Sequence, residues 1–340
     1  MNSDFKIKID ANNFEEAIVK ILKEIRSNWI DKEINFKVFS EGITNKLVGT
    51  YCNSVSEMIL FRINGNKTEI LIDRSAEIIN MKLLNKYGFA PEIYATFLNG
   101  ICYEFIPGVI LNTETVKEPT IWKLIATQMA KMHKIPLSNQ QKYGDPMIKR
   151  VGLTYLDLIP DKFSDNEINE RISNIFPSKS DLKQQFAFLM DILQSSNSQI
   201  VFCHNDLLLS NIIYTSDTSK ISLIDFEYAE PNYQAFDIGN HFAKMSGASS
   251  DSFIDYSRFP TKDFQMKWLK YYLREFYGQK DVSTLEIEKL YEDVKKFVAS
   301  SHFLWTCWCL IQAEISGIKF DFVKLAKTYY NEYLYRKNQL

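Results

Sequence analysis

The chain has 340 residues and a formal net charge of −2, with 46% hydrophobic and 14% aromatic residues. This length allows one large or two smaller domains, the composition supports a real core, and the near-neutral charge argues against a broad nucleic-acid-binding surface. No signal segment or span of roughly 20 apolar residues is visible, and five scattered cysteines without zinc-site spacing indicate reduced thiols of a cytoplasmic protein.

The first hundred residues predict a small β-rich lobe that begins with a helix. Apolar residues at helical spacing over 12–26 predict an amphipathic helix. Short β-type runs follow at 36–39, 46–51, 57–63, 68–72, 93–97 and 101–105, with a turn at 64–65 between the third and fourth. Ser75 is expected to cap a helix that stops at Gly88. We place this lobe at residues 1–106.

Residues 107–340 predict a larger, mainly helical lobe with one β-rich insert. Helical periodicity is found over 120–133, 164–175, 180–195, 235–246, 262–277, 285–315 and 321–336. The insert covers 199–227, where the apolar runs NIIY and ISLID are expected to pair as a hairpin across the turn TSDTSK. The pattern therefore predicts an α+β protein with two lobes.

The insert carries the residue types of a phosphotransfer site. Asp206 lies in a polar loop, Asn211 follows five positions later, and Asp225 ends the last apolar strand. Phosphoryl transfer needs positioning and charge neutralisation more than covalent chemistry. Asp206 is suited to accept the proton of a substrate hydroxyl, and Asn211 and Asp225 offer oxygen ligands for Mg²⁺. The plainer alternative is an ordinary surface loop followed by a strand-end cap.

Six blocks of sequence resemble the choline/ethanolamine kinase family. They are GITNKLVGTY from Gly42, RINGNKTE from Arg62, NGICYEFIPG from Asn99, HNDLLLSNIIY from His204, IDFEYAEPNYQAFDIGNHF from Ile224 and SSHFLWTCWCLIQAEIS from Ser300. GITNKL with GNKTE favours the ethanolamine branch. The resemblance implies a protein-kinase-like bilobal fold and ATP- and Mg²⁺-dependent phosphorylation of ethanolamine. This reaction is the first step of phosphatidylethanolamine synthesis by the CDP-ethanolamine route.

The resemblance also implies a set of nucleotide contacts, namely Asn45, Lys46, Arg62, Glu77, Glu104, Phe105 and Ile224. The segment from Gly42 to Tyr51 would fold over phosphates, although its two glycines are equally typical of an ordinary hairpin. Arg62 would grip a phosphate and pair with Glu77, whereas two surface charges are the plainer interpretation. Glu104 and Phe105 belong to the adenine-binding segment, and Ile224 would line the pocket floor.

The family pattern places the amino-alcohol pocket at Tyr228, Trp305, Trp308, Phe320 and Phe322, with charge from Asp206, and for the two phenylalanines it leaves the choice between pocket and plain core open. Trp305 and Trp308 are three positions apart and share a helix face, a spacing that by itself favours plain core. Glu227 is a further candidate for metal or substrate, and Asp237 is expected to brace the catalytic loop or cap a helix.

One position departs from the family. Lys244 stands where the family usually carries an acidic residue, and a lysine near an ammonium site would repel the substrate unless it points away. Glu314 stands where related chains often have lysine, so a charge swap between the two positions is conceivable.

Alternative functions remain open at this point. A choline kinase would use the same residue types, and an aminoglycoside kinase shares the catalytic loop layout. A pseudokinase has Lys244 as its only support, whereas a protein kinase would need an Asp-Phe-Gly that is Asp-Phe-Glu here. The expected partner is a small molecule, with no nucleic acid and no membrane span, and a homodimer is left open.

Overall fold

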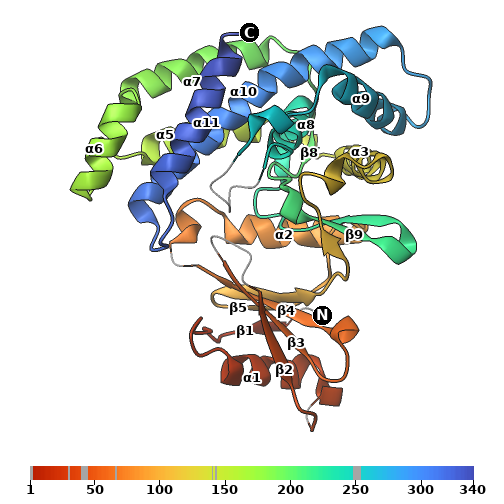
Figure 1. Cartoon of the computed structure of the whole chain (residues 1–340). Coiled ribbons are helices and arrows are strands. Elements are labelled where there is room, and N and C mark those ends of the chain that lie inside the picture. The colour runs from red at the N-terminus through yellow and green to blue at the C-terminus, as the bar shows by residue number, and fades with distance from the viewer. Residues whose placement is uncertain are drawn as a thin grey trace. The chain divides into compact units, whose positions relative to one another are not determined.

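The computed structural model describes residues 3–29, 31–39, 45–65, 67–139, 141, 144–247 and 254–340. The chain divides into two compact units after Val109, an N-terminal unit and a C-terminal unit, and each is described by itself. The N-terminal unit carries a sheet and the C-terminal unit is mainly helical, so the predicted α+β class is confirmed (Figure 1). Gly42 lies outside the described residues.

The N-terminal unit is built on a six-stranded sheet with the order β1-β5-β6-β4-β3-β2. Its elements are β1 (Ser3–Phe5), α1 (Glu15–Ile25), β2 (Asn35–Phe39), β3 (Asn45–Tyr51), β4 (Ile59–Asn64), α2 (Arg74–Lys86), β5 (Ile93–Phe97) and β6 (Gly100–Glu104). Ile18, Ile21 and Leu22 of α1 join one buried cluster with Val48 and Phe61 of the sheet. The amphipathic pattern predicted over 12–26 thus produces the helix that covers one sheet face.

Two predictions for this unit are wrong. Thr68–Ile70 form a 3-10 turn instead of a strand at 68–72, because β4 already pairs with β3 on one edge and with β6 on the other. Asp73 caps α2 instead of Ser75, since its Oδ1 accepts hydrogen bonds from the backbone N–H groups of Ser75 and Ala76, both at 3.0 Å.

The C-terminal unit contains the helices α3 (Pro119–His133), α5 (Met147–Leu158), α6 (Asn166–Ile175), α7 (Lys179–Gln194), α8 (Gln234–Lys244), α9 (Lys262–Phe276), α10 (Thr284–Ile315) and α11 (Phe322–Lys337). Its strands are β8 (Ile200–Cys203), β9 (Ile212–Thr215), β10 (Lys220–Leu223) and β11 (Glu230–Tyr233), while β7 (Val109–Ile110) lies at the division. The seven predicted helices are present and α5 was not predicted. The predicted hairpin is confirmed, since β9 pairs antiparallel with β10.

Helix α10 forms the centre of this unit and packs against α8, α11 and α5 (Figure 1). The contact with α8 is unusually close at Gly239. A Cβ added there would lie 3.1 Å from the nitrogen of Val298 and 3.2 Å from the oxygen of Val294. Glycine therefore lets the two helix backbones touch, and the contact holds the middle of α8 against the middle of α10.

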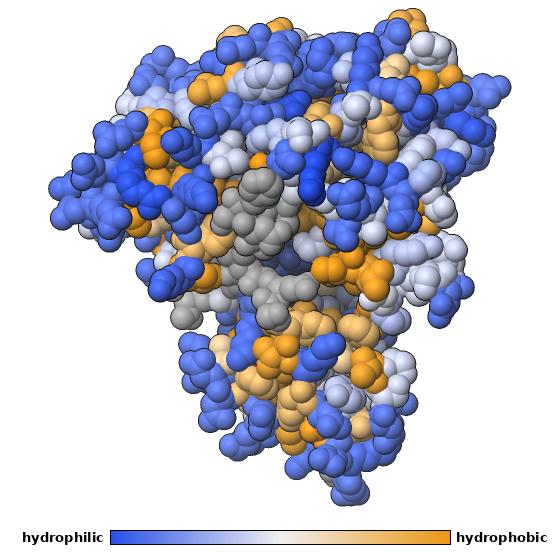
Figure 2. All heavy atoms as spheres, in the orientation of Figure 1, coloured by the Kyte–Doolittle hydropathy of each residue, from blue (hydrophilic) through white to orange (hydrophobic). Residues whose placement is uncertain are grey.

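The visible face of the C-terminal unit is mostly hydrophilic, whereas apolar side chains gather over the sheet in the N-terminal unit (Figure 2). None of the helices in the described part of the chain combines the length and the apolar character that crossing a membrane requires.

Candidate active site

The candidate catalytic loop runs from His204 to Asn211, between β8 and β9, and Asp237 of α8 fixes its start. The carboxylate of Asp237 accepts hydrogen bonds from the backbone nitrogens of His204 and Asn205, both at 2.8 Å. His133 of α3 lies 3.0 Å from the same carboxylate. Burial opposes ionisation of Asp237, but these hydrogen bonds hold its pKa below the ordinary value. Asp237 thus braces the loop.

Asn205 locks the turn that presents Asp206. Its backbone is left-handed, with a φ of 66°, a conformation that asparagine tolerates better than most residues. Its Nδ2 donates to the carbonyl oxygens of Tyr228 at 2.8 Å and Glu230 at 3.1 Å, and its Oδ1 accepts from Asn232 at 2.8 Å. Sequence reasoning missed this role, although an asparagine directly before the candidate base was a usable signal.

Asp206 is half-buried at the tip of this turn. Its pKa is raised from 3.8 to about 7, mainly by burial; the ammonium of Lys244 opposes this rise, and the carboxylates of Glu227 and Asp237 add to it. A carboxyl group with a pKa near the working pH is well matched to accept a proton and to release it again. The environment of Asp206 therefore fits a general base.

Asn211 and Asp225 are brought to neighbouring positions by the β9–β10 hairpin. The backbone oxygen of Asn211 accepts a hydrogen bond from the nitrogen of Ile224 at 3.0 Å, next to Asp225. The Nδ2 of Asn211 donates to the carbonyl oxygen of Asp206 at 3.0 Å, which directs the amide oxygen elsewhere. Asp225 adopts a left-handed φ of 62°. An amide oxygen beside a carboxylate is a donor set that fits a hard cation such as Mg²⁺.

Ile224, which is expected to lie near adenine, also contacts the catalytic loop through its backbone. Its carbonyl oxygen lies 3.0 Å from the Nε2 of His204. Burial lowers the pKa of His204, so the imidazole is neutral at pH 7. His204 therefore connects the two strand ends that carry Asp206 and Asp225.

Three of the predicted pocket residues form one aromatic cluster. The rings of Tyr228 and Trp305 meet edge to face at 5.4 Å, and those of Trp305 and Trp308 at 6.0 Å. The indole N–H of Trp308 donates to the hydroxyl of Tyr228 at 2.9 Å, and that of Trp305 to the Oδ1 of Asn240 at 2.8 Å. Because both indole N–H groups are hydrogen-bonded, the two tryptophan rings have fixed orientations.

Phe320 reaches this cluster only through Phe322. Its ring centroid lies 4.8 Å from that of Phe322, which in turn lies 6.0 Å from that of Trp308. Phe322 is buried and Phe320 is half-buried. Of the two phenylalanines, Phe322 is therefore the direct neighbour of the tryptophans.

The N-terminal unit contains an ionic cluster made by the buried Arg62 and Glu77 and the half-buried Arg74 and Asn45. One carboxylate oxygen of Glu77 lies 2.5 Å from the guanidinium of Arg62, and the other lies 3.0 Å from that of Arg74. Arg74 also donates to the Oδ1 of Asn45 at 3.2 Å. The pairing of Arg62 with Glu77 follows the prediction, and Arg74 was missed although it lies three positions before Glu77 on the same helix.

Lys46 does not join the ionic cluster. Successive side chains of a strand point to opposite faces, so Lys46 leaves the sheet on the side opposite to Asn45. Its ammonium donates to the carbonyl oxygen of Ala11 and lies 4.6 Å from the ring centroid of Phe14. The structure thus separates two residues that were predicted to act together.

Glu104 and Phe105 lie where β6 ends. Glu104 is exposed, and its carboxylate accepts a hydrogen bond from the nitrogen of Glu92 at 3.3 Å. The ring of Phe105 lies 6.5 Å from that of Phe39. Within the described part of the chain, neither side chain contacts the ionic cluster. This agrees with the expectation that the segment would bind adenine through its backbone groups.

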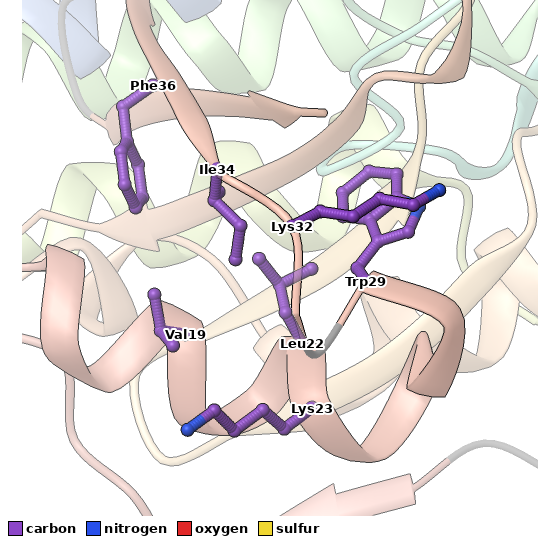
Figure 3. A pocket seen from close by; sticks show the side chains of 7 residues that line it. All are labelled: Val19, Leu22, Lys23, Trp29, Lys32, Ile34 and Phe36. Carbon is purple, nitrogen blue, oxygen red and sulfur yellow. The ribbon is translucent and has the colours of Figure 1, made fainter. Parts of the chain in front are cut away.

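A separate hollow of about 300 Å³ lies between α1 and the chain that leads into β2 (Figure 3). Its described lining consists of Val19, Leu22, Lys23, Trp29, Lys32, Ile34 and Phe36. None of the candidate site residues is among them, and these residues include no carboxylate. The hollow therefore has no part in the candidate chemistry.

Comparison with known proteins gives a consistent result. The choline/ethanolamine kinase family matches residues 36–334. An ethanolamine kinase of Drosophila melanogaster is 47% identical, with coverage of 97% of this chain and 79% of that protein. The solved structure of an ethanolamine kinase from Plasmodium vivax has a TM-score of 0.84 at 27% identity and covers 97% of this chain and 92% of that one. A choline kinase structure from Cryptosporidium parvum shares the fold, with a TM-score of 0.78 at 23% identity over 96% of each chain.

Proposed function

The chain belongs to the choline/ethanolamine kinase family and is an ATP-using phosphotransferase, and from this premise we propose that its acceptor is ethanolamine. The product would be phosphoethanolamine, the first intermediate on the CDP-ethanolamine route to phosphatidylethanolamine. The observation that carries this proposal is Asp206, a carboxylate with a pKa raised to about 7 on a loop anchored by Asp237. The ethanolamine kinases of Drosophila melanogaster and Plasmodium vivax support the choice of substrate.

In the proposed reaction Asp206 takes the proton of the acceptor hydroxyl. The hydroxyl oxygen forms a bond to the γ-phosphorus of ATP as the bond from that phosphorus to the bridging oxygen breaks, and ADP leaves. The proton remains on Asp206 until solvent removes it. The hydrogen bonds from Asn205 to Tyr228 and Glu230 keep the loop in place, so the base is positioned before the substrate arrives.

Asn211 and Asp225 are proposed to hold Mg²⁺ through oxygen atoms. Bound there, the ion would neutralise charge on the phosphates of ATP. Arg62 is proposed to contact a phosphate with its guanidinium, which the carboxylate of Glu77 holds in one orientation. For Asn45, Glu104, Phe105 and Ile224 a part in nucleotide binding stays a prediction, as it does for Lys46.

The ammonium group of the acceptor is proposed to bind among Tyr228, Trp308 and Asp206. Aromatic faces attract a cation through their quadrupoles, and the carboxylate adds charge. Phe320 and Phe322 would close the apolar side of this pocket beside Trp308.

A turnover assay on the purified chain tests the proposal. ATP, Mg²⁺ and either ethanolamine or choline are supplied, and the phosphorylated product is measured by mass. We expect phosphoethanolamine as the product, and we expect no product in excess chelator.

The two proposed Mg²⁺ ligands can be tested in the same assay. The activity of Asn211→Ala should be partly rescued by added Mg²⁺, whereas that of Asp225→Ala should not. No product from ethanolamine, or full turnover without divalent metal, would contradict the proposal, and product from choline alone would replace it by the choline kinase alternative.

Two further expectations stay predictions. We propose that the protein works in the cytoplasm, which cell fractionation can test. The homodimer left open by the sequence can be tested by light scattering on the purified chain.

A further inference from the structure

Lys244 places an ammonium group of the protein itself inside the aromatic cluster. It is the last residue of α8 and is only 5% exposed. Its Nζ lies 4.6 Å from the ring centroid of Trp305 and 5.0 Å from that of Tyr329. The same atom donates a hydrogen bond to the hydroxyl of Tyr329 at 3.2 Å. The side chain of Lys244 therefore already lies on the ring of Trp305, which was predicted to bind the ammonium group of the substrate.

The charge of Lys244 has no carboxylate partner at ion-pair distance among the described residues. Glu314, the candidate for a charge swap, accepts a hydrogen bond from the nitrogen of Ser164 at 3.0 Å instead. Burial lowers the pKa of Lys244, and the negative charge of Asp206 raises it. The ammonium is thus held by two aromatic rings, one hydroxyl and the field of Asp206.

The other rings of the cluster have no such cation. Among the described residues no lysine or arginine stacks on Trp308 or Tyr228. The indole N–H of Trp308 instead donates a hydrogen bond to the hydroxyl of Tyr228 at 2.9 Å. Among the described residues of this cluster, Trp305 therefore carries a cation of the protein, whereas Trp308 and Tyr228 carry none.

On the basis of the proposed function, we propose that Lys244 makes the acceptor site selective for a primary ammonium over a trimethylammonium group. A trimethylammonium group has no N–H donors and relies on ring faces for its binding. A primary ammonium has three N–H donors and can donate hydrogen bonds to Asp206 and to hydroxyl groups. It therefore loses less binding free energy than a trimethylammonium group when Lys244 occupies the ring of Trp305. Repulsion by Lys244 weakens both cations alike, whereas the occupied ring selectively weakens choline.

The test is Lys244→Met, which keeps the length of the side chain and removes its charge. The kcat/KM values for choline and ethanolamine are measured side by side, and their ratio is the readout because it is insensitive to the fraction of active protein. We expect the choline-to-ethanolamine ratio to rise by roughly 2- to 30-fold, the range that corresponds to one regained cation–π contact. A ratio that stays the same or falls would overturn the proposal.

Lys123 offers a matched control. Its Nζ lies 5.6 Å from the ring centroid of Trp122 and 5.1 Å from that of Tyr271, so it also stacks on one tryptophan and one tyrosine. Lys123→Met should leave the substrate ratio unchanged. An equal change of the ratio in Lys123→Met would show that the effect has nothing to do with the aromatic cluster.

A double-mutant cycle tests the mechanism directly. If Lys244 acts by occupying Trp305, then Lys244→Met should no longer change the ratio in a Trp305→Leu background. The same ratio change in both backgrounds would rule out ring occupancy.

Binding without turnover separates this inference from the proposed function. The shift in Tm caused by choline chloride and by ethanolamine is measured for the wild type, Lys244→Met and Lys244→Gln, the last as a polar variant that tolerates burial. A choline shift that grows relative to the ethanolamine shift supports the role of Lys244, even if neither compound is phosphorylated. A lack of turnover in the wild type contradicts the proposed function alone, and unchanged relative shifts in both variants contradict the role of Lys244 alone.

Discussion

The two units bury positive charge in different ways. In the N-terminal unit, Arg62 and Arg74 share the two carboxylate oxygens of Glu77. In the C-terminal unit, Lys244 lies on the rings of Trp305 and Tyr329 with one hydroxyl as hydrogen-bond partner. A buried ion pair fixes geometry but leaves an uncompensated charge when one partner is removed. An ammonium held by rings lacks that dependence, so its charge can be changed with little cost to the fold.

The difference separates structural from chemical roles. Removal of the Glu77 carboxylate should reduce stability as well as the proposed phosphate contact of Arg62, whereas removal of the half-buried carboxylate of Asp206 should mainly reduce activity. The raised pKa of Asp206 already shows that its environment disfavours the charge.

The largest effect is expected from Asp206→Asn. This change keeps the shape of the side chain and removes the base, so kcat should fall by about 10²–10⁴. The thermal unfolding midpoint near pH 7 should be no lower than that of the wild type, because an amide replaces a carboxylate that burial disfavours. Rapid-quench or steady-state phosphorylation assays measure the first quantity and circular dichroism the second. Retention of most of the activity would show that Asp206 is not the base.

Glu77→Gln should lower stability in addition to any effect on the phosphate contact of Arg62. It removes the carboxylate that Arg62 and Arg74 share, and breaking a buried ion pair typically costs about 3–5 kcal/mol. The midpoint of urea unfolding should therefore fall markedly. Glu16→Gln is the control, because Glu16 pairs with Lys20 on the exposed surface of the same unit and should leave the midpoint unchanged. Equal midpoints for Glu77→Gln and the wild type would mean that the cluster is held by other partners.

The pH dependence of kcat/KM is the most specific test of Asp206. Because only ionised Asp206 can accept a proton and its pKa is raised to about 7, kcat/KM should fall about tenfold per pH unit below 7 and level off above it. The ammonium of Lys244 lowers this pKa, so Lys244→Met should move the rising limb to higher pH. A profile that is flat between pH 5 and 7 would contradict the assignment.

The same group has a consequence for stability. Between its ordinary pKa of 3.8 and about 7, Asp206 keeps a proton in the folded state that the unfolded chain has lost. Its contribution to the free energy of unfolding should therefore decrease as the pH rises through this range. Asp206→Asn removes this contribution, so the difference in stability between variant and wild type should grow from pH 4 to pH 7.

Local patterns predicted much of the C-terminal unit. The apolar runs on either side of TSDTSK define the β9–β10 hairpin, and the hairpin alone brings Asn211 next to Ile224 and Asp225. The strand at 68–72 failed because the edge of β4 is already taken by β6, a pairing between residues distant in sequence. Helix α5 was missed, and Gly152 within it weakens the helical pattern.

The position of Lys244 was the least predictable feature of the candidate site. The sequence identified an unusual residue type, but its direction depends on the packing of α8 on α10 and on Tyr329 of α11. The bracing carboxylate of Asp237 was predicted. The asparagines around it were not, since Asn205, Asn232 and Asn240 meet only after folding.

The backbone contact at Gly239 also has a mechanical meaning. Side chains that lie between two helices can adjust when one helix shifts. At Gly239, α8 and α10 meet through backbone atoms with no side chain of α8 between them. One position further along, the amide of Asn240 accepts from Trp305 of α10 and donates to the carbonyl oxygen of Asn205 at 3.1 Å, the residue before Asp206. Two hydrogen bonds of one amide therefore tie Trp305, the ring on which the ammonium of Lys244 lies, to the turn that presents Asp206.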